Sequence, residues 1–152
     1  MTLTHLHLML NHLPVLGPTL GLLLLLLGLA RGSEEWKRAG LALFIVAAVF
    51  VIPTYLTGAP AEQAVQGLPG IDGKVNAKHE EVAQLASSAA LVLGGLSVSA
   101  LLLFRRSGPM PNWFAAILLA VALTAAALMA WTANLGGEVR HTEIRPVPAL
   151  RE

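Results

Sequence analysis

The stretch LGLLLLLLGLA at residues 20–30 contains no charged side chain and ends a longer apolar run. A helix needs about 20 such residues to cross a bilayer. Backbone polar groups in lipid must be paired, and continuous leucine and alanine runs without strict alternation favour helices over a membrane barrel. The sequence therefore predicts an all-α protein, an integral membrane four-helix up-down bundle that forms a single domain over residues 1–152. Its spanning helices are expected at about 6–30, 41–57, 82–104 and 113–134.

The composition also indicates a membrane protein, because 55% of the 152 residues are hydrophobic and only 12% are charged. The formal charge is +1 and no basic run is present, which excludes nucleic-acid binding. The absence of cysteine excludes disulfides, thiolate nucleophiles, an iron–sulfur cluster held by this chain and a covalently attached c-type haem. Any metal chemistry must use histidine, methionine or carboxylate ligands.

Charges and turn-forming residues separate the apolar runs. Two breaks are short, at residues 31–38 and 105–109, and we expect the longer one, 58–78, to be an ordered loop over the end of the bundle. Positive residues in short loops favour the cytoplasmic side. We therefore expect a multi-pass protein of a bacterial inner (cytoplasmic) membrane with both termini on the outer (periplasmic) side. The first run lacks the basic flank and cleavage site of a signal peptide, so we expect it to be retained.

All the histidines fall on one side of this topology: His5, His7, His12, His79 and His141. Asn11 and the Glu80-Glu81 pair lie on the same side, while the opposite half of the bundle is almost wholly apolar. Ionisable side chains at or below the membrane interface are costly, so a cluster of them marks a site or an internal partner.

A haem b between helices needs two neutral imidazoles from different segments and small residues beside the porphyrin. His79 precedes a helical stripe of small residues that predicts room for a flat ligand: Ala83, Ala86, Ala90, Gly94 and Ser97. We expect His79 to be one axial ligand, with His12 or His7 opposite. Arg140 and Lys78 are candidates to meet the propionates.

His141 is a further candidate for cofactor binding, but it is the least constrained histidine. The Gly136-Gly137 pair is expected to end the fourth helix and to leave His141 on a cap loop.

Two other uses of these residues stay open. His5 and His7, with Met9 and the Glu80-Glu81 pair nearby, could bind copper or zinc, for which imidazole is a suitable ligand. Glu80, Glu81 and Asn11 could instead handle protons at a quinone site, a use that is compatible with haem binding.

Several short motifs together resemble a group of uncharacterised four-helix bacterial membrane proteins, and the likeness covers most of the chain. In that group a His-x-Pro opens the first helix, a histidine starts the third, and a Gly-Gly element followed by a histidine closes the fourth. The matching positions here are His12 with Pro14, His79, and Gly136-Gly137 with His141. The group is distantly similar to the small two-haem cytochrome b membrane proteins, which implies electron transfer between quinone and a partner. No histidine lies near the inner surface of this chain, so one outer haem, or none, fits better than two.

The leading hypothesis is a membrane electron-transfer subunit in which His12 and His79 ligate an outward-side haem b. It would work near a quinone site, as part of a quinone-linked oxidoreductase complex, with other membrane subunits or a periplasmic redox protein as partners. The alternative is a small structural or assembly subunit of a larger respiratory or photosynthetic membrane complex, with no cofactor of its own.

Overall fold

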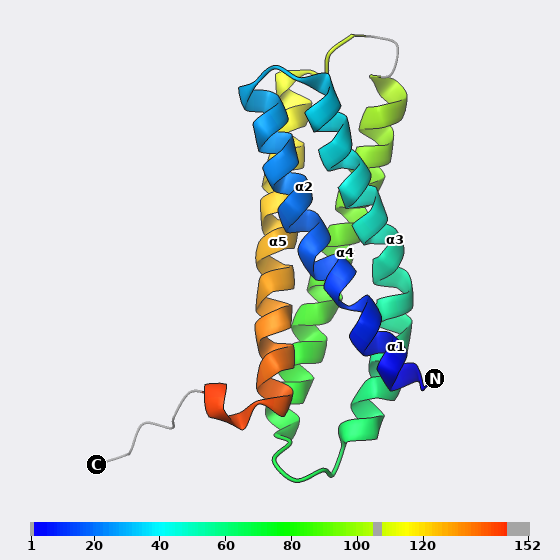
Figure 1. The fold of residues 1–152 in the computed structure, drawn as a ribbon, viewed down its shortest axis with the longest axis vertical. Coiled ribbons are helices and arrows are strands. Elements are labelled where there is room, and N and C mark those ends of the chain that lie inside the picture. The colour runs from blue at the N-terminus through cyan, green and yellow to red at the C-terminus, as the bar shows by residue number, and fades with distance from the viewer. Residues whose placement is uncertain (1, 105–107, 146–152) are drawn as a thin grey trace, which may run out of the picture.

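The protein is a bundle of long helices, described by a computed structural model for residues 2–104 and 108–145 (Figure 1). No strand occurs in these two ranges, which confirms the all-α four-helix fold. Four stretches are long and apolar enough to cross a membrane: Leu3–Ala30, Glu34–Val65, Gly73–Leu103 and Asn112–Arg140. The elements are α1 (Leu3–Leu10), α2 (His12–Ala30), α3 (Glu34–Val65), α4 (Gly73–Leu103), α5 (Asn112–Arg140) and the 3-10 turn η1 (Thr142–Ile144).

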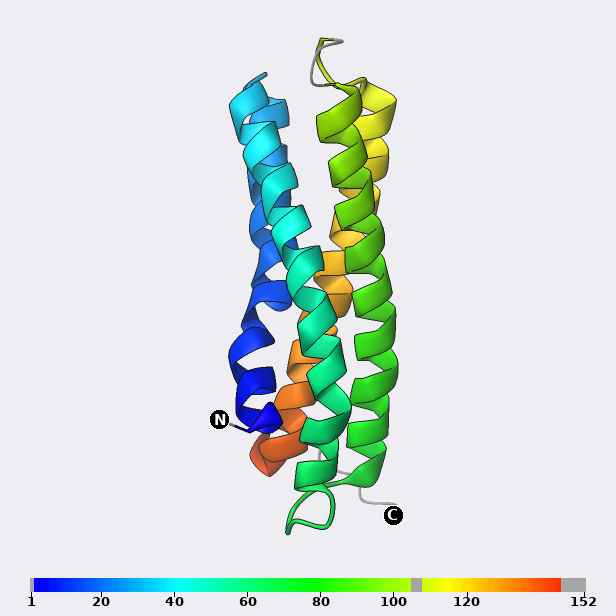
Figure 2. The same ribbon diagram turned by 90° about the vertical axis from the view of Figure 1, so that its right-hand side faces the viewer.

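The helices run up and down, and each of α2 to α5 contacts its neighbours around the bundle. Figure 2 shows α2–α3 and α4–α5 as two hairpins whose upper ends stand apart. We call the end formed by α1, the turn at residues 66–72 and the C-terminal part of α5 the histidine end. The other end carries the turn at residues 31–33 and the connection from α4 to α5. Arg105 and Arg106, which contribute to the expected orientation, lie outside the described residues.

The first crossing is broken at Asn11, between α1 and α2. Proline lacks an amide hydrogen, so Pro14 cannot donate to the carbonyl of Leu10, and the single helix expected from residue 6 to 30 divides there. The shorter piece, α1, then packs against α3, while α2 lies against both α3 and α5 (Figure 1).

The prediction of a long loop at residues 58–78 is wrong. Helix α3 continues to Val65 and α4 begins at Gly73, so the connection covers only residues 66–72. Gly67 and Gly70 adopt positive φ in this turn, and the Asp72 side chain accepts a hydrogen bond from the amide of Lys74 at 2.8 Å to cap α4. The hydropathy pattern identifies only the strongly apolar part of each helix. Both helices continue beyond that part as helix with a more polar sequence.

The prediction that the fourth helix ends at Gly136-Gly137 is also wrong, because α5 continues to Arg140. Both glycines keep negative φ, and each faces a neighbouring side chain: His79 lies beside Gly136 and Ile144 beside Gly137. These contacts explain how a helix persists through two residues of low helix propensity.

The core of the bundle closes over the small-residue stripe of α4. Ala86 and Ala90 are buried in one apolar cluster with Val51 and Met129, and Gly94 lies against Ala48. The room for a flat ligand that was expected along this stripe is therefore filled by α3 and α5, since small residues in membrane bundles let neighbouring helices approach closely. His79 itself, at the start of the stripe, is only partly buried.

Candidate functional site

His7 points from α1 into the histidine end and is held by α3. Its Nδ1 lies 3.0 Å from the backbone carbonyl oxygen of Thr54 and 3.3 Å from the hydroxyl of Thr57. A carbonyl oxygen can only accept a hydrogen bond, so Nδ1 carries the hydrogen. The ring is partly buried, and a Cβ placed on Gly58 would be 3.8 Å from its Cε1 atom.

His79 is held in the same manner by the other hairpin. Its Nδ1 donates to the backbone carbonyl oxygen of Thr132 on α5 at 3.0 Å. Gly136 follows Thr132 by four positions, one helical turn, and its missing side chain makes space for the ring: a Cβ there would be 3.1 Å from Cε1 of His79.

The two anchors repeat one local pattern, a threonine followed four residues later by a glycine, at Thr54/Gly58 and Thr132/Gly136. Each threonine hydroxyl donates back to its own helix, Thr54 to Phe50 at 2.8 Å and Thr132 to Leu128 at 2.8 Å. Each threonine carbonyl meets a histidine ring, but only Gly136 is needed to make space, because a Cβ on Gly58 would be in ordinary contact with His7. The pattern makes the two hairpins local equivalents at the histidine end.

Both rings offer the same chemistry. In a neutral imidazole whose Nδ1 carries the hydrogen, Nε2 holds a lone pair. Within the described residues, Nε2 of His7 and Nε2 of His79 have no hydrogen-bond partner. Anchoring of one ring nitrogen by a carbonyl is the arrangement that orients a metal-ligating histidine. Each ring is therefore set to act as a base or as a ligand through Nε2.

The electrostatic surroundings connect the two rings with two carboxylates. His7, Glu62 and Glu80 all lie within electrostatic range of the His79 ring. Glu62 is fixed by the side-chain amide of Asn76, which donates to Oε1 at 2.8 Å between α3 and α4. Asn76 is only 7% exposed, so this polar pair belongs to the interior of the histidine end.

The other predicted ligands lie at the surface. His12 is exposed at the start of α2 and has no hydrogen-bond partner within the described residues. His5 is exposed, and its Nδ1 lies 3.0 Å from the hydroxyl of Thr2. The structure therefore leaves His12 exposed, whereas His7 and His79 are partly buried and anchored to neighbouring helices.

The other predicted polar residues, Lys78, Arg140 and Asn11, also lie at the histidine end. Lys78 donates to Glu81 at 2.9 Å and lies 5.6 Å from the centre of the Trp131 ring. Arg140 is exposed in the last turn of α5. Asn11 occupies the break between α1 and α2, where its backbone N–H donates to the backbone carbonyl of His7.

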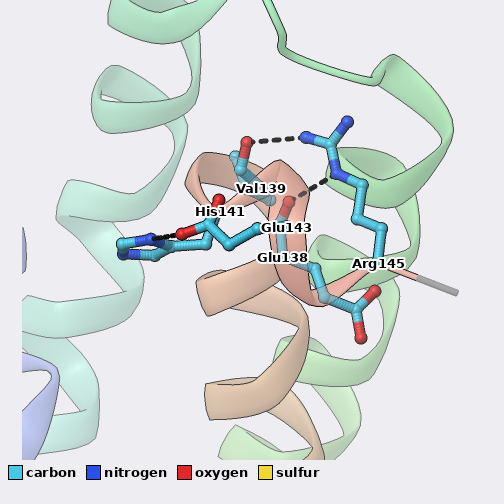
Figure 3. A network of polar contacts seen from close by, with 5 residues as sticks. All are labelled: Glu138, Val139, His141, Glu143 and Arg145. Carbon is cyan, nitrogen blue, oxygen red and sulfur yellow. Dashed lines mark hydrogen bonds and ion pairs between the residues drawn. The ribbon is translucent and has the colours of Figure 1, made fainter.

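His141 lies beyond the end of α5 in a separate polar network (Figure 3). Its Nδ1 is 2.9 Å from Oε1 of Glu143. A hydrogen bond from its own backbone amide, together with the one from His141, holds the pKa of the exposed Glu143 carboxyl below its usual value. Arg145 closes the network by donating to the carbonyls of Glu138 at 2.8 Å and Val139 at 3.1 Å.

Arg145 also ties this network to the α3–α4 turn. Its second contact from Nη2 reaches the carbonyl of Gly70 at 2.8 Å. A helix leaves its last carbonyls without intrahelical partners, and an arginine side chain that binds them stabilises the helix end. This network is therefore a structural clasp, separate from the His7 and His79 rings.

No group of three or more histidine and carboxylate side chains comes together as a metal cluster in the part of the chain that the structure describes. His7 and His79 are the two partly buried imidazoles that the described residues hold at this end. His7, His79 and Gly136 are only partly covered, whereas Val82 and Ala86, further along α4, are buried. Two imidazoles that are anchored through Nδ1 and have no partner at Nε2 among the described residues are the donor type that a haem would require.

The sequence patterns did not identify Thr54, Thr132, Glu62 and Asn76. The two threonines could have been found as polar residues one turn before a glycine in otherwise apolar helices. Glu62 and Asn76 fell in the stretch assigned to a loop. No protein family, curated protein or solved structure matches this chain. Its functional interpretation therefore depends on the geometry of the histidine end.

Proposed function

We propose that this protein is a membrane electron-transfer subunit in which Nε2 of His7 and Nε2 of His79 would hold one haem b at the histidine end. The observation that supports the proposal is the matched anchoring of the two rings. Each Nδ1 donates to a threonine carbonyl at 3.0 Å, and each Nε2 is free of partners among the described residues. His7 takes the place of His12 in the expected pair because His12 is exposed on α2.

The bound haem would supply one-electron redox chemistry, and the residues of the chain would hold and tune it. The carbonyls of Thr54 and Thr132 fix the tautomer and the direction of the two rings. Arg140, which has no ion-pair partner within the described residues, is the candidate to meet a propionate. Lys78 is a weaker candidate because it already binds Glu81.

We further propose that a quinone exchanges electrons and protons at this end. Glu80 is exposed and its charge acts on His79, which suits a carboxylate that transfers protons beside the ligand. Glu81 is paired with Lys78, and Asn11 lies at the break between α1 and α2, so we assign them supporting positions.

The orientation is part of the same proposal. Arg31, Lys37 and Arg38 flank the end opposite to the histidines. Positive residues near short loops favour the cytoplasmic side. We therefore place the histidine end on the outer side of a bacterial cytoplasmic membrane, where a periplasmic redox protein or another membrane subunit can reach it.

The test is a reduced-minus-oxidised absorption spectrum of the full chain purified in detergent. A b-type difference band is expected, and it should be lost in His7→Ala and in His79→Ala. His12→Ala and His141→Ala are matched controls that remove exposed imidazoles from the same end, and both should keep the band. Added imidazole should restore the band in His7→Ala, which separates a lost ligand from a lost fold.

Two results would contradict this assignment. A band that survives in His7→Ala but disappears in His12→Ala would make His12 the ligand. If the wild-type chain is helical but has no reducible band, the role of His7 and His79 would be structural, as hydrogen bonds between helices. The protein would then be a scaffold subunit of a larger membrane complex.

A further inference from the structure

A carboxylate and an amide form a polar pair in the interior of the histidine end. The side-chain amide of Asn76 on α4 donates to Oε1 of Glu62 on α3 at 2.8 Å. Asn76 is only 7% exposed, and Glu62 is partly buried. Within the described residues, Oε2 of Glu62 has no hydrogen-bond partner. The pair therefore fixes one carboxylate oxygen and leaves the other open to a proton.

The pair lies one helical turn from each of the two anchored rings. Residues three or four positions apart on a helix share a face and are neighbours. Asn76 precedes His79 by three positions, and Glu62 follows Gly58, which lies beside the His7 ring, by four positions. Glu62 is also within electrostatic range of the His79 ring. A change of charge at the level of the rings therefore acts on the Glu62 carboxylate.

The negative charge of Glu62 has little compensation from its neighbours. Within the described residues, it forms no ion pair with any cation of this end: Lys74, Lys78, Arg140 or Arg145. The other titratable groups around the His79 ring are His7 from α1 and Glu80 from α4. Glu80 is exposed, so water screens its charge, whereas Glu62 is partly buried and accepts from one neutral amide. An electron added near such a carboxylate favours its protonated form.

We propose that Glu62 is the interior proton acceptor of the histidine end and that Asn76 holds it in position. When one electron enters the site, one proton from the outer water bonds to Oε2 of Glu62, while Oε1 keeps its hydrogen bond from Asn76. The net charge of this end is then unchanged, and the electron and the proton leave together when the site is oxidised again. This inference rests on the proposed function, in which a quinol is oxidised as the site is reduced. It adds the residue that couples the electron to a proton inside the bundle.

The experiment measures the reduction potential of the full chain with haem bound, in detergent, from acidic to mildly alkaline pH. Uptake of one proton per electron changes the redox equilibrium by up to tenfold per pH unit, which is about 59 mV for one electron. We expect this slope in the wild-type chain and a nearly flat profile in Glu62→Gln, whose side-chain oxygen can still accept from Asn76. Glu138→Gln is the matched control and should keep the slope. Glu138 also accepts from an asparagine amide, that of Asn134 at 2.6 Å, but this pair is exposed.

A second readout needs no variant. Infrared difference spectra between the reduced and the oxidised wild-type chain should show the carbonyl stretch of a protonated carboxyl after reduction. Its absence would overturn the inference even if Glu62→Gln did not bind haem.

Three results of the potential measurement would also overturn the inference: a potential independent of pH in the wild-type chain, a slope that survives in Glu62→Gln, and an equal loss of slope in Glu138→Gln. The b-type band is present in each of these results, so the proposed function would stand. The absence of that band from the wild-type chain would overturn the proposed function and this inference together.

Discussion

The replacement of Gly136 by alanine tests how closely the His79 ring is held. The new Cβ would lie 3.1 Å from Cε1 and 3.5 Å from Nδ1 of His79. Such contacts require a shift of a few tenths of an ångström, in the region of the ring that donates to Thr132. The same change at Gly58 places the Cβ 3.8 Å from His7, an ordinary contact, and at Gly95 it meets nothing within 4 Å.

The expected magnitudes follow from two opposing effects. Alanine is favoured over glycine inside a helix by about 0.8–1 kcal/mol, and all three glycines have negative φ. Crowding in a packed site costs about 1–3 kcal/mol, and a weakened hydrogen bond adds about 0.5–1.5 kcal/mol. Gly58→Ala and Gly95→Ala should therefore stabilise the protein by up to about 1 kcal/mol. The free energy of unfolding of Gly136→Ala should be lower than that of both other variants by about 1–3 kcal/mol.

The assay is reversible unfolding in mixed micelles, followed by circular dichroism as sodium dodecyl sulfate is increased. A nitrogen chemical-shift measurement on the His79 ring gives a second readout, because the Nδ1 signal should move in Gly136→Ala and stay in place in Gly95→Ala. Equal stabilisation by all three alanines, with an unchanged His79 signal, would refute the close contact between Gly136 and the ring.

Three further changes test the rest of the histidine end. Asn76→Ala leaves the Glu62 carboxylate without its interior donor and should lower the free energy of unfolding in micelles by about 1–3 kcal/mol, with the loss reduced when the acceptor is already removed by Glu62→Ala. Arg145→Met removes the clasp between α5 and the α3–α4 turn, and hydrogen exchange should accelerate in both segments while the middle of the bundle keeps its protection. The pKa of Glu143 is lowered by its own amide and by His141, so the stabilisation of η1 is fully present above the usual value near 4.5 and is lost as the pH falls through the lower folded value. The protection of the η1 amides, measured relative to their intrinsic exchange rate at each pH, should fall as the pH is lowered through that range, and a flat protection profile would count against the hydrogen bonds.

The apolar half of the bundle was predictable from the sequence because one physical rule governs it. Lipid requires a continuous apolar helix, and the leucine run of α2 satisfies that rule without reference to any other residue. The ends of α3 and α4 were not predictable in this manner. Residues 58–65 and 73–81 are helical outside the strongly apolar runs, and a hydropathy pattern does not distinguish a polar helix from a loop.

The histidine end was only partly predictable for a related reason. The sequence located all the histidines at one end, but the choice between His7 and His12 depends on the helix break at Asn11 and on which carbonyl each ring meets. Gly136 shows the same limit. In the sequence it is a helix terminator, whereas in the fold it is the space that the His79 ring occupies.

The break at Asn11 also sets the depth of the chain in the bilayer. The 19 residues of α2 have a length of about 28 Å at 1.5 Å per residue, close to the hydrocarbon thickness of about 30 Å. Helix α3 has 32 residues and α4 has 31, so each exceeds that thickness by several turns. If α2 fills the hydrocarbon, α1 and the polar extensions of α3 and α4 stand among the lipid headgroups. His7 and His79 then lie at a depth that water reaches, and a redox partner needs no passage through the hydrocarbon to meet them.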